Sequence, residues 1–528
     1  MAVSSLLAGA PALAQTLPPA ASQVPQGSPI PRILPPKPPA VAPGAALPAL
    51  PPPGVAVPNR PVRVSSVAVE GVTAYPAGSF AHDLQGLTGP AVPLPKINAA
   101  RQAILQQYRS DGYVLTTVSA SLDAAGKLRF IVTEGRIASV KLDGNIGPAG
   151  TQVLRFLHRL TQQTPINAAT LERYLLLAQD VPGVTLRAVL EPSADVPGAL
   201  NLIAQVSRKP ISGLLTFDNR AFDQTGPIEG LGVVDFNSFT EFGEKTEVSW
   251  YHTFPNSQNF GQLSEEFYLG GSGLKLHLYA GTGLAIPTGG GTGGLGLLDY
   301  HGRTNVFGGT LSYPVIRARQ QTLNVYIAFD AIESMIRTNT GSGGLSEASS
   351  DQLRVLRLGE DYARSDILFG AERAAVNAVS FRVSHGLHGL GADGNDADGS
   401  RLAPRVNEQT DFTKLNFEFS RTQTLFNPWQ GGSVALMGLV AGQWSGDILP
   451  PAEQFYLGGG RFTRGYYAGQ VAGDKALAAT AELQLNTDLN LTKWHIPRDL
   501  ATQFYLFYDW GETWQNAPDI QPVVIGSA

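Results

Sequence analysis

The chain of 528 residues is long enough for several domains, or for one very large domain with accessory modules. Its net charge of −5 at pH 7 gives no reason to expect nucleic acid as a partner. The absence of cysteine excludes a disulfide framework and a cysteine-ligated metal. No run reaches the ~18 consecutive apolar residues of a membrane helix. The chain is therefore either soluble or a membrane β-barrel, and its 59 glycines, 23 phenylalanines and 16 tyrosines favour the barrel.

The N-terminal region has the composition of an export segment followed by a linker. Residues 1–15 carry an apolar run that ends in Ala12-Leu13-Ala14, which we interpret as a signal peptide remnant without its basic part. A disordered apolar tail is the alternative. Residues 16–62 are rich in proline and carry few charges, so they cannot pack a core. We expect a disordered, extended linker there.

Two modules of about seventy residues follow, at 63–135 and 136–209, and they look like an internal repeat. Ile97-Asn98-Ala99-Ala100 recurs as Ile166-Asn167-Ala168-Ala169, and in both copies we expect the asparagine to cap a helix. Leu171, Tyr174, Leu175 and Ala178 then fall on one helical face. Each module should fold as strand, helix, helix, strand, strand, which makes it a small α+β unit.

From residue 210 to 528 the sequence changes to long strands of alternating polarity. Leu415, Phe417 and Phe419 alternate with polar residues, and other segments repeat the pattern. A soluble sandwich would also show such alternation. These strands are too many and too long for one sandwich, however, and an antiparallel transmembrane β-barrel fits them better.

We count about thirteen strands in this region. They lie near 211–219, 226–237, 245–254, 262–270, 274–285, 303–316, 321–335, 351–365, 375–387, 411–425, 431–445, 475–489 and 500–511. Single-chain bacterial barrels normally have an even number of strands. We therefore expect the sheet to be C-terminally truncated, with an unpaired edge on its last strand or a gap facing its first.

The candidate site joins a glycine-rich loop to a strand. The loop at 446–474 contains Thr463-Arg464-Gly465-Tyr466, and the strand contains Phe507-Tyr508-Asp509-Trp510-Gly511. If the loop folds into the barrel, Arg464 can pair with Asp509 on the polar face of the strand, because guanidinium and carboxylate form bidentate, charge-assisted hydrogen bonds. The alternative is a surface loop that is merely rich in glycine and aromatic residues.

These features together resemble a known family over residues 64–528. The two modules look like POTRA domains, and the chain is similar to the transporters of two-partner secretion (TpsB, the ShlB/FhaC/HecB-type haemolysin secretion/activation family). The loop motif is similar to the family's VRGY motif, and the strand motif to its F-x-D-x-G motif. The resemblance implies a loop-to-wall contact formed by Arg464, Gly465, Tyr466, Asp509 and Gly511. It also implies a barrel of sixteen strands.

The resemblance implies an outer-membrane translocator with POTRA modules in the periplasm. These modules would bind an unfolded exoprotein, which resembles a haemolysin or adhesin, and export would need no ATP, cofactor or metal. We expect a monomer that contacts outer-membrane lipid. The alternatives are an assembly factor that inserts outer-membrane proteins, a passive porin, and an enzyme anchored by a barrel. His277, His301, His385 and His388 have no carboxylate at metal-binding or triad spacing, so an enzyme is disfavoured.

Overall fold

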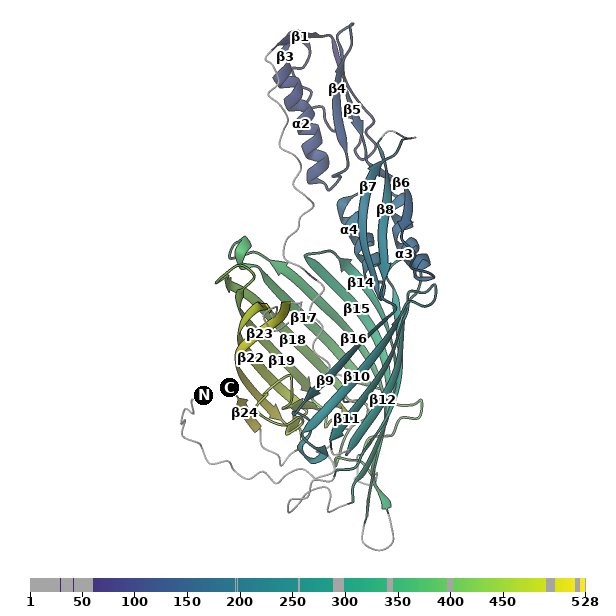
Figure 1. Cartoon of the computed structure of the whole chain (residues 1–528), viewed down its shortest axis with the longest axis vertical. Coiled ribbons are helices and arrows are strands. Elements are labelled where there is room, and N and C mark those ends of the chain that lie inside the picture. Colours follow the sequence, from purple (N-terminus) through teal and green to yellow (C-terminus); the bar gives the residue numbers. More distant parts are fainter. Residues whose placement is uncertain are drawn as a thin grey trace.

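The computed structural model describes residues 60–194, 196, 198–254, 257–287, 299–339, 345–396, 402–490, 499–517 and 523–527, together with Pro29 and Val41. The predicted signal peptide at 1–15 and most of the predicted linker at 16–62 lie outside the described residues. Figure 1 shows two small modules stacked end to end beyond one rim of a large curved sheet. Within the described residues, no helix is both long and apolar enough to cross a membrane.

The first module is a three-stranded sheet covered by one helix. Its strands are β2 (Ser66–Glu70), β5 (Lys127–Thr133) and β4 (Thr117–Leu122), in that order, with the helix α2 (Leu94–Ser110). β2 runs parallel to β5, and β4 runs antiparallel to it. Ile104 and Tyr108 of α2 are buried in one core with Phe130 of β5. A short pair, β1 (Pro61–Val64) with β3 (Gly89–Pro93), stands beside this sheet.

The second module repeats this arrangement and has the full predicted order of elements. They are β6 (Arg136–Asp143), α3 (Ala149–Leu157), the 3₁₀ turn η2 (His158–Gln162), α4 (Ala168–Gln179), β7 (Val184–Pro192) and β8 (Ala199–Arg208). The strand order is β6-β8-β7, with β6 parallel to β8. The predicted helical face is confirmed, because Leu171 and Ala178 are buried in the core and Tyr174 and Leu175 pack against it.

The prediction of matching helix caps was right for one module and wrong for the other. Asn167 precedes α4, and its side chain accepts a hydrogen bond from Ala169 N. In the first module α2 already begins at Leu94, so Asn98 lies inside the helix and accepts from Arg101 instead. Pro95 explains the earlier start, since proline suits the first turn of a helix. The expected first helix of this module is a run of turns in the described residues.

In the described residues, the large sheet has fourteen antiparallel strands, which lie side by side in chain order. They are β9 (Ile211–Asp218), β10 (Ile228–Asn237), β11 (Lys245–Phe254), β12 (Gln258–Tyr268), β13 (Lys275–Ala285), β14 (His301–Arg317), β15 (Gln321–Asn339), β16 (Leu345–Asp366), β17 (Ala375–Gly386), β18 (Thr413–Phe426), β19 (Ser433–Ser445), β22 (Lys475–Asn490), β23 (Asp499–Trp514) and β24 (Val523–Ser527). The thirteen predicted strands correspond to β9 through β19, β22 and β23. The sequence reading missed β24, which is short and scarcely alternates.

The sheet is open along one side in the part of the chain that the structure describes. β9 pairs there only with β10, and β24 only with β23. β24 covers Asp509 to Thr513 of β23, and no described strand pairs with the rest of that side. The expected gap between the first and last strands is thus present, although the last strand is β24 rather than β23.

Side chains on the sheet alternate as the sequence predicts. On β23, Phe504, Leu506 and Tyr508 are exposed on the outer face, whereas Asp509 is fully buried on the inner face. An apolar outer face and a polar inner face suit lipid outside and water inside. The concave side of the sheet therefore offers polar partners to any segment that folds into it.

The second module is fixed to the near rim of the sheet by specific contacts (Figure 1). Arg173 of α4 donates to the carbonyl oxygen of Pro314 at 2.7 Å. Arg317 donates through Nε and Nη2 to the two oxygens of Asp180, both at 2.7 Å. Tyr268 of β12 is buried in the core of the module itself. The module and the barrel rim thus share packing as well as ion pairs.

We predict that Glu134→Ala loosens the first module. The carboxylate accepts from the N–H groups of Thr73 and Ala74 at 2.8 and 2.9 Å and from the hydroxyl of buried Tyr108 at 2.6 Å. Leaving such donors unpaired costs about 1–3 kcal/mol. Amide hydrogen exchange in residues 72–75 should therefore accelerate. Glu70→Ala, at an exposed carboxylate on the same module, is the control.

The same experiment has an expected pH dependence. Burial raises the pKa of Glu134, but the hydrogen bonds from Thr73 and Tyr108 outweigh it and hold the pKa below its ordinary value. A carboxylate of this kind stabilises the fold above its unfolded pKa of about 4.3, and the stabilisation is lost as pH falls through the folded pKa. The exchange difference between Glu134→Ala and the parent should shrink below about pH 4. A constant difference would contradict this assignment.

Candidate functional site

The loop between β19 and β22 is the centre of the candidate site. It contains the 3₁₀ turn η6 (Pro451–Glu453) and a hairpin of β20 (Phe455–Leu457) with β21 (Val471–Gly473). Leu449 is fully buried in a cluster with inner-face residues such as Leu231 and Val355, which lie on β10 and β16. The loop therefore packs against the concave side of the sheet.

The structure brings Arg464, at the loop tip, into contact with Asp509 of β23. Arg464 donates to the two carboxylate oxygens through Nε at 2.9 Å and Nη2 at 2.8 Å, and its main-chain N–H donates to Asp509 at 2.9 Å. A third guanidinium nitrogen, Nη1, donates to Glu482 of β22 at 3.3 Å. The pairing is bidentate, which is the geometry that guanidinium offers and ammonium does not.

Burial and an aromatic ring strengthen this contact. Asp509 is fully buried, and 9% of the Arg464 side chain is exposed. The guanidinium carbon lies 3.9 Å from the centre of the Phe507 ring, a cation–π distance. Three hydrogen bonds compensate the buried carboxylate, so removing the arginine side chain would leave a buried charge with its main-chain partner alone. Breaking a buried pair in this way costs on the order of 3–5 kcal/mol.

The other predicted site residues shape the loop. Gly465 is exposed, and Tyr466 is half-buried and bonded through its main chain, accepting from Gly459 N and donating to Thr463 O. Gly511 faces the hairpin, where an added Cβ would lie 2.7 Å from the side chain of buried Leu457. The glycine of the strand motif thus makes room for β20 to pack against β23.

Left-handed backbone conformations set the turn that presents Arg464. Gly458 has φ of 97°, and a Cβ there would lie 1.9 Å from the carbonyl oxygen of Tyr467. Thr463 has φ of 51° and is fully buried, and its hydroxyl accepts from Gly458 N at 2.8 Å. Threonine therefore fits this position, because its hydroxyl closes the turn.

The tip of the loop also touches the first hairpin of the sheet. Ala468 N donates to the carbonyl oxygen of Arg220, in the connection between β9 and β10, at 3.2 Å. Arg461 pairs with Glu418 of β18. The loop thus contacts both the β9–β10 connection at the start of the sheet and β23 near its end.

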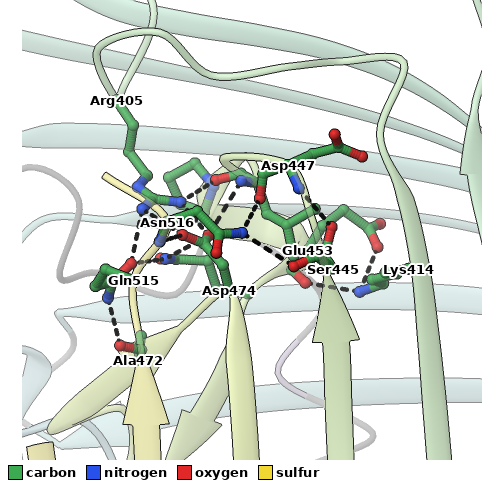
Figure 2. A network of polar contacts seen from close by, with 12 residues as sticks. Arg405, Lys414, Ser445, Asp447, Glu453, Ala472, Asp474, Gln515 and Asn516 are labelled. Atoms are coloured by element: carbon green, nitrogen blue, oxygen red, sulfur yellow. Dashed lines mark hydrogen bonds and ion pairs between the residues drawn. The ribbon is translucent and has the colours of Figure 1, made fainter. Parts of the chain in front are cut away.

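Sequence reasoning missed a second set of contacts, at the base of the loop (Figure 2). Arg405, from the β17–β18 connection, donates to the two oxygens of fully buried Asp474 at 2.6 and 3.1 Å. Gln515 and the main-chain N–H of Asn516, after β23, join the same network. Glu453 pairs with Lys414 nearby. Isolated charges in polar loops gave no sequence signal, because their partners lie far away in the chain.

The described residues offer no metal site. No group of three or more histidine, aspartate or glutamate side chains in the described ranges could hold a metal ion. His388 and Asp411 do pair, at 2.8 Å, which their sequence spacing did not reveal, but 63% of the histidine side chain is exposed. The side chains of the candidate site attach the β19–β22 loop to the inner face of the sheet.

Comparison with known proteins identifies the family. Residues 291–528 match the family model for "Haemolysin secretion/activation protein ShlB/FhaC/HecB". Residues 62–135 match the model for "POTRA domain, ShlB-type". The chain belongs to the ShlB/FhaC/HecB family of haemolysin secretion/activation proteins. It is therefore a two-partner secretion transporter of the outer membrane with its POTRA modules in the periplasm, and it is not an enzyme.

Relatives of this ShlB-type transporter agree with this assignment. The heme/hemopexin transporter protein HuxB of Haemophilus influenzae strain 86-028NP is 19% identical over 468 residues, which span 85% of this chain and 75% of HuxB. CdiB from Escherichia coli has the same fold, with a TM-score of 0.68, 17% identity and coverage of 91% of this chain and 85% of CdiB. CdiB from Acinetobacter baumannii gives a TM-score of 0.58 at 16% identity, covering 89% and 83% of the two chains.

We predict that Gly511→Val displaces the β20–β21 hairpin from the wall. The new side chain would overlap Leu457, and neither a strand nor a buried leucine can easily yield. The expected result is reduced secretion of the exoprotein with normal transporter in the outer membrane. Gly438→Val on β19 is the matched control, because a Cβ there meets nothing within 4 Å. Equal secretion by the two variants would contradict the packing argument.

Proposed function

We propose that the contact of Arg464 with Asp509 is the element that holds the β19–β22 loop inside the barrel during secretion. The bidentate geometry, the burial of Asp509 and the extra main-chain hydrogen bond support this role. The contact is architectural, since it fixes the loop and transforms no substrate. The exoprotein would pass through the polar interior of the barrel, past this loop.

We infer further that the POTRA modules receive the exoprotein in unfolded form. β4 and β7 are edge strands of their sheets, and no strand of the described chain pairs with their outer sides. On β4 every residue except Val118 is exposed. An extended chain can pair with such an edge through its main chain, whatever its sequence. Secretion of a heme- or haemolysin-related exoprotein fits the names of the relatives, HuxB among them.

The loop proposal predicts unequal but non-additive effects of two substitutions. Asp509→Ala removes three hydrogen bonds, whereas Arg464→Ala removes the side-chain bonds and keeps the one from its main-chain N–H. Both should lower exoprotein secretion, Asp509→Ala more strongly. The double variant should secrete only slightly less than Asp509→Ala, because it loses in addition only the longer contact of Arg464 with Glu482. Arg464→Lys should rescue only partly.

The measurement is exoprotein in the medium, normalised to transporter in the outer membrane. Arg461→Ala is the control, because this arginine lies in the same loop but half of its side chain is exposed, and exposed pairs contribute about 0–1 kcal/mol. It should secrete nearly normally. Fully additive losses for Arg464→Ala and Asp509→Ala, or normal secretion by both, would refute the proposed role.

The POTRA proposal predicts a contact along β4. A photoreactive p-benzoylphenylalanine in place of exposed Ser121 should crosslink to the coexpressed exoprotein, whereas the same residue in place of exposed His82, away from the sheet edge, should not. Crosslinks at Ser121 should disappear when the exoprotein is not expressed. Equal crosslinking at both positions would argue against strand addition at this edge.

A further inference from the structure

Glu453 lies at the base of the β19–β22 loop and is 1% exposed. Its carboxylate accepts from Arg357 of β16, through Nη2 at 2.7 Å and Nη1 at 3.1 Å. Lys414 of β18 lies 2.7 Å from the same carboxylate. This glutamate belongs to no recognised motif of the sequence, and its partners differ from those of Arg464.

The main chain of Glu453 is held as well as its side chain. Its carbonyl oxygen accepts from Lys414 Nζ at 2.7 Å and from Gln443 Nε2 of β19 at 3.1 Å. Arg357 also contacts Asp330 of β15 through Nε, and Asp330 accepts from a tyrosine hydroxyl on β13. Arg357 Nη1 also donates to the hydroxyl of Ser384 on β17 at 3.0 Å. Side chains from six strands of the inner wall are therefore connected, directly or through Arg357 and Asp330, to a single loop residue.

Oppositely charged side chains are paired in this attachment. The two carboxylates of Glu453 and Asp330 face the two cations of Arg357 and Lys414, and between 2% and 13% of each of these side chains is exposed. Charges so far from water are tolerated only when they are paired and hydrogen-bonded. Loss of Glu453 would leave Lys414 without its carboxylate and Arg357 with one anion instead of two.

The attachment at Glu453 and the one at Arg464 use different parts of the wall. Glu453 is held by β16, β18 and β19, whereas Arg464 is held by β22 and β23. Glu453 thus forms an ionic anchor before β20, at the base of the loop, and Arg464 forms one at its tip. The Arg405–Asp474 pair holds the other end of the loop, after β21.

We propose that Glu453 is a positioning residue for secretion, which anchors the base of the loop to β16 and β18 and keeps it attached when the Arg464 tip is released. A base that stays fixed lets the tip leave the wall and return to the same place. The inference extends the proposed role of the Arg464–Asp509 contact, but the base anchor itself can be tested without secretion.

The chain has no cysteine, so single introduced thiols report local opening without background. Two half-buried alanines are matched positions for them: Ala452→Cys is the base probe and Ala468→Cys is the tip probe. The readout is the rate of reaction with a methanethiosulfonate reagent on the full chain in outer membranes. Glu453→Gln should raise the rate at the base probe by about tenfold and the rate at the tip probe by less. Arg464→Ala should do the reverse.

Further variants guard against a general structural defect. Lys414→Gln should act at the base probe in the same direction as Glu453→Gln, and Glu453→Asp should restore part of the protection. Glu372→Gln, at an exposed glutamate in the β16–β17 turn, should change neither probe. Opening of both probes together in Arg464→Ala, or an unchanged rate at the base probe in Glu453→Gln, would overturn the two-anchor inference.

The secretion assay then separates the two proposals. Glu453→Gln should lower exoprotein secretion while the amount of transporter in the outer membrane stays normal. Normal secretion with an opened base probe would overturn the positioning role of Glu453. If each variant exposes only its own probe but Arg464→Ala secretes normally, the proposed role of the Arg464–Asp509 contact is refuted. The inference that Glu453 anchors the base of the loop would still hold.

Discussion

The arrangement of this transporter depends on buried ion pairs, in which one partner lies on the inner face of the sheet and the other lies in the β19–β22 loop. Asp509 has no exposed surface, so it must meet cationic or N–H donors in the folded chain. Those donors come from Arg464, which the loop alone supplies. The strands therefore favour this path of the loop, because along it Asp509 is buried with three hydrogen bonds from Arg464.

The wall can supply such partners because of its alternation. A strand that faces lipid on one side and the interior on the other carries polar residues at every second position. Lys414 and Gln443 occupy these positions on neighbouring strands, as do Glu482 and Asp509 further along the sheet. The outward residues between them, such as Leu415 and Phe419, are apolar and exposed. One periodicity thus produces both the membrane surface and the binding surface for the loop.

The sequence sufficed to predict the parts of the fold that depend on local pattern. Thirteen strands, the second module and the orientation of Asp509 follow from alternation, helical spacing and turn residues. The start of α2 was missed because Pro95 favours an earlier first turn than the asparagine would give. The role of β24 was missed because Val523 to Ser527 scarcely alternates. Family motifs, not periodicity, directed attention to Arg464.

The base of the loop could not be predicted in the same way. Glu453 and Arg357 are 96 positions apart, and Arg405 and Asp474 are 69 apart. Neither pair has a motif or a fixed spacing, because the register of intervening strands and the path of the loop together decide which charges meet. Their pairing is a property of the assembled sheet. Only a three-dimensional arrangement of the inner faces reveals that side chains of six strands connect to one glutamate.

An ionic attachment also suits a loop that must be able to move. Apolar contacts in the interior of the barrel, such as Leu457 against Gly511, lose their stabilisation when water reaches both surfaces. Separated guanidinium and carboxylate groups instead regain hydration, which offsets much of the lost attraction. The cost of opening then depends on how much water the interior admits. A closed, dry interior holds the tip firmly, whereas an interior widened and wetted by a passing chain lowers the cost of release at Arg464, and the pairing can re-form when the water leaves.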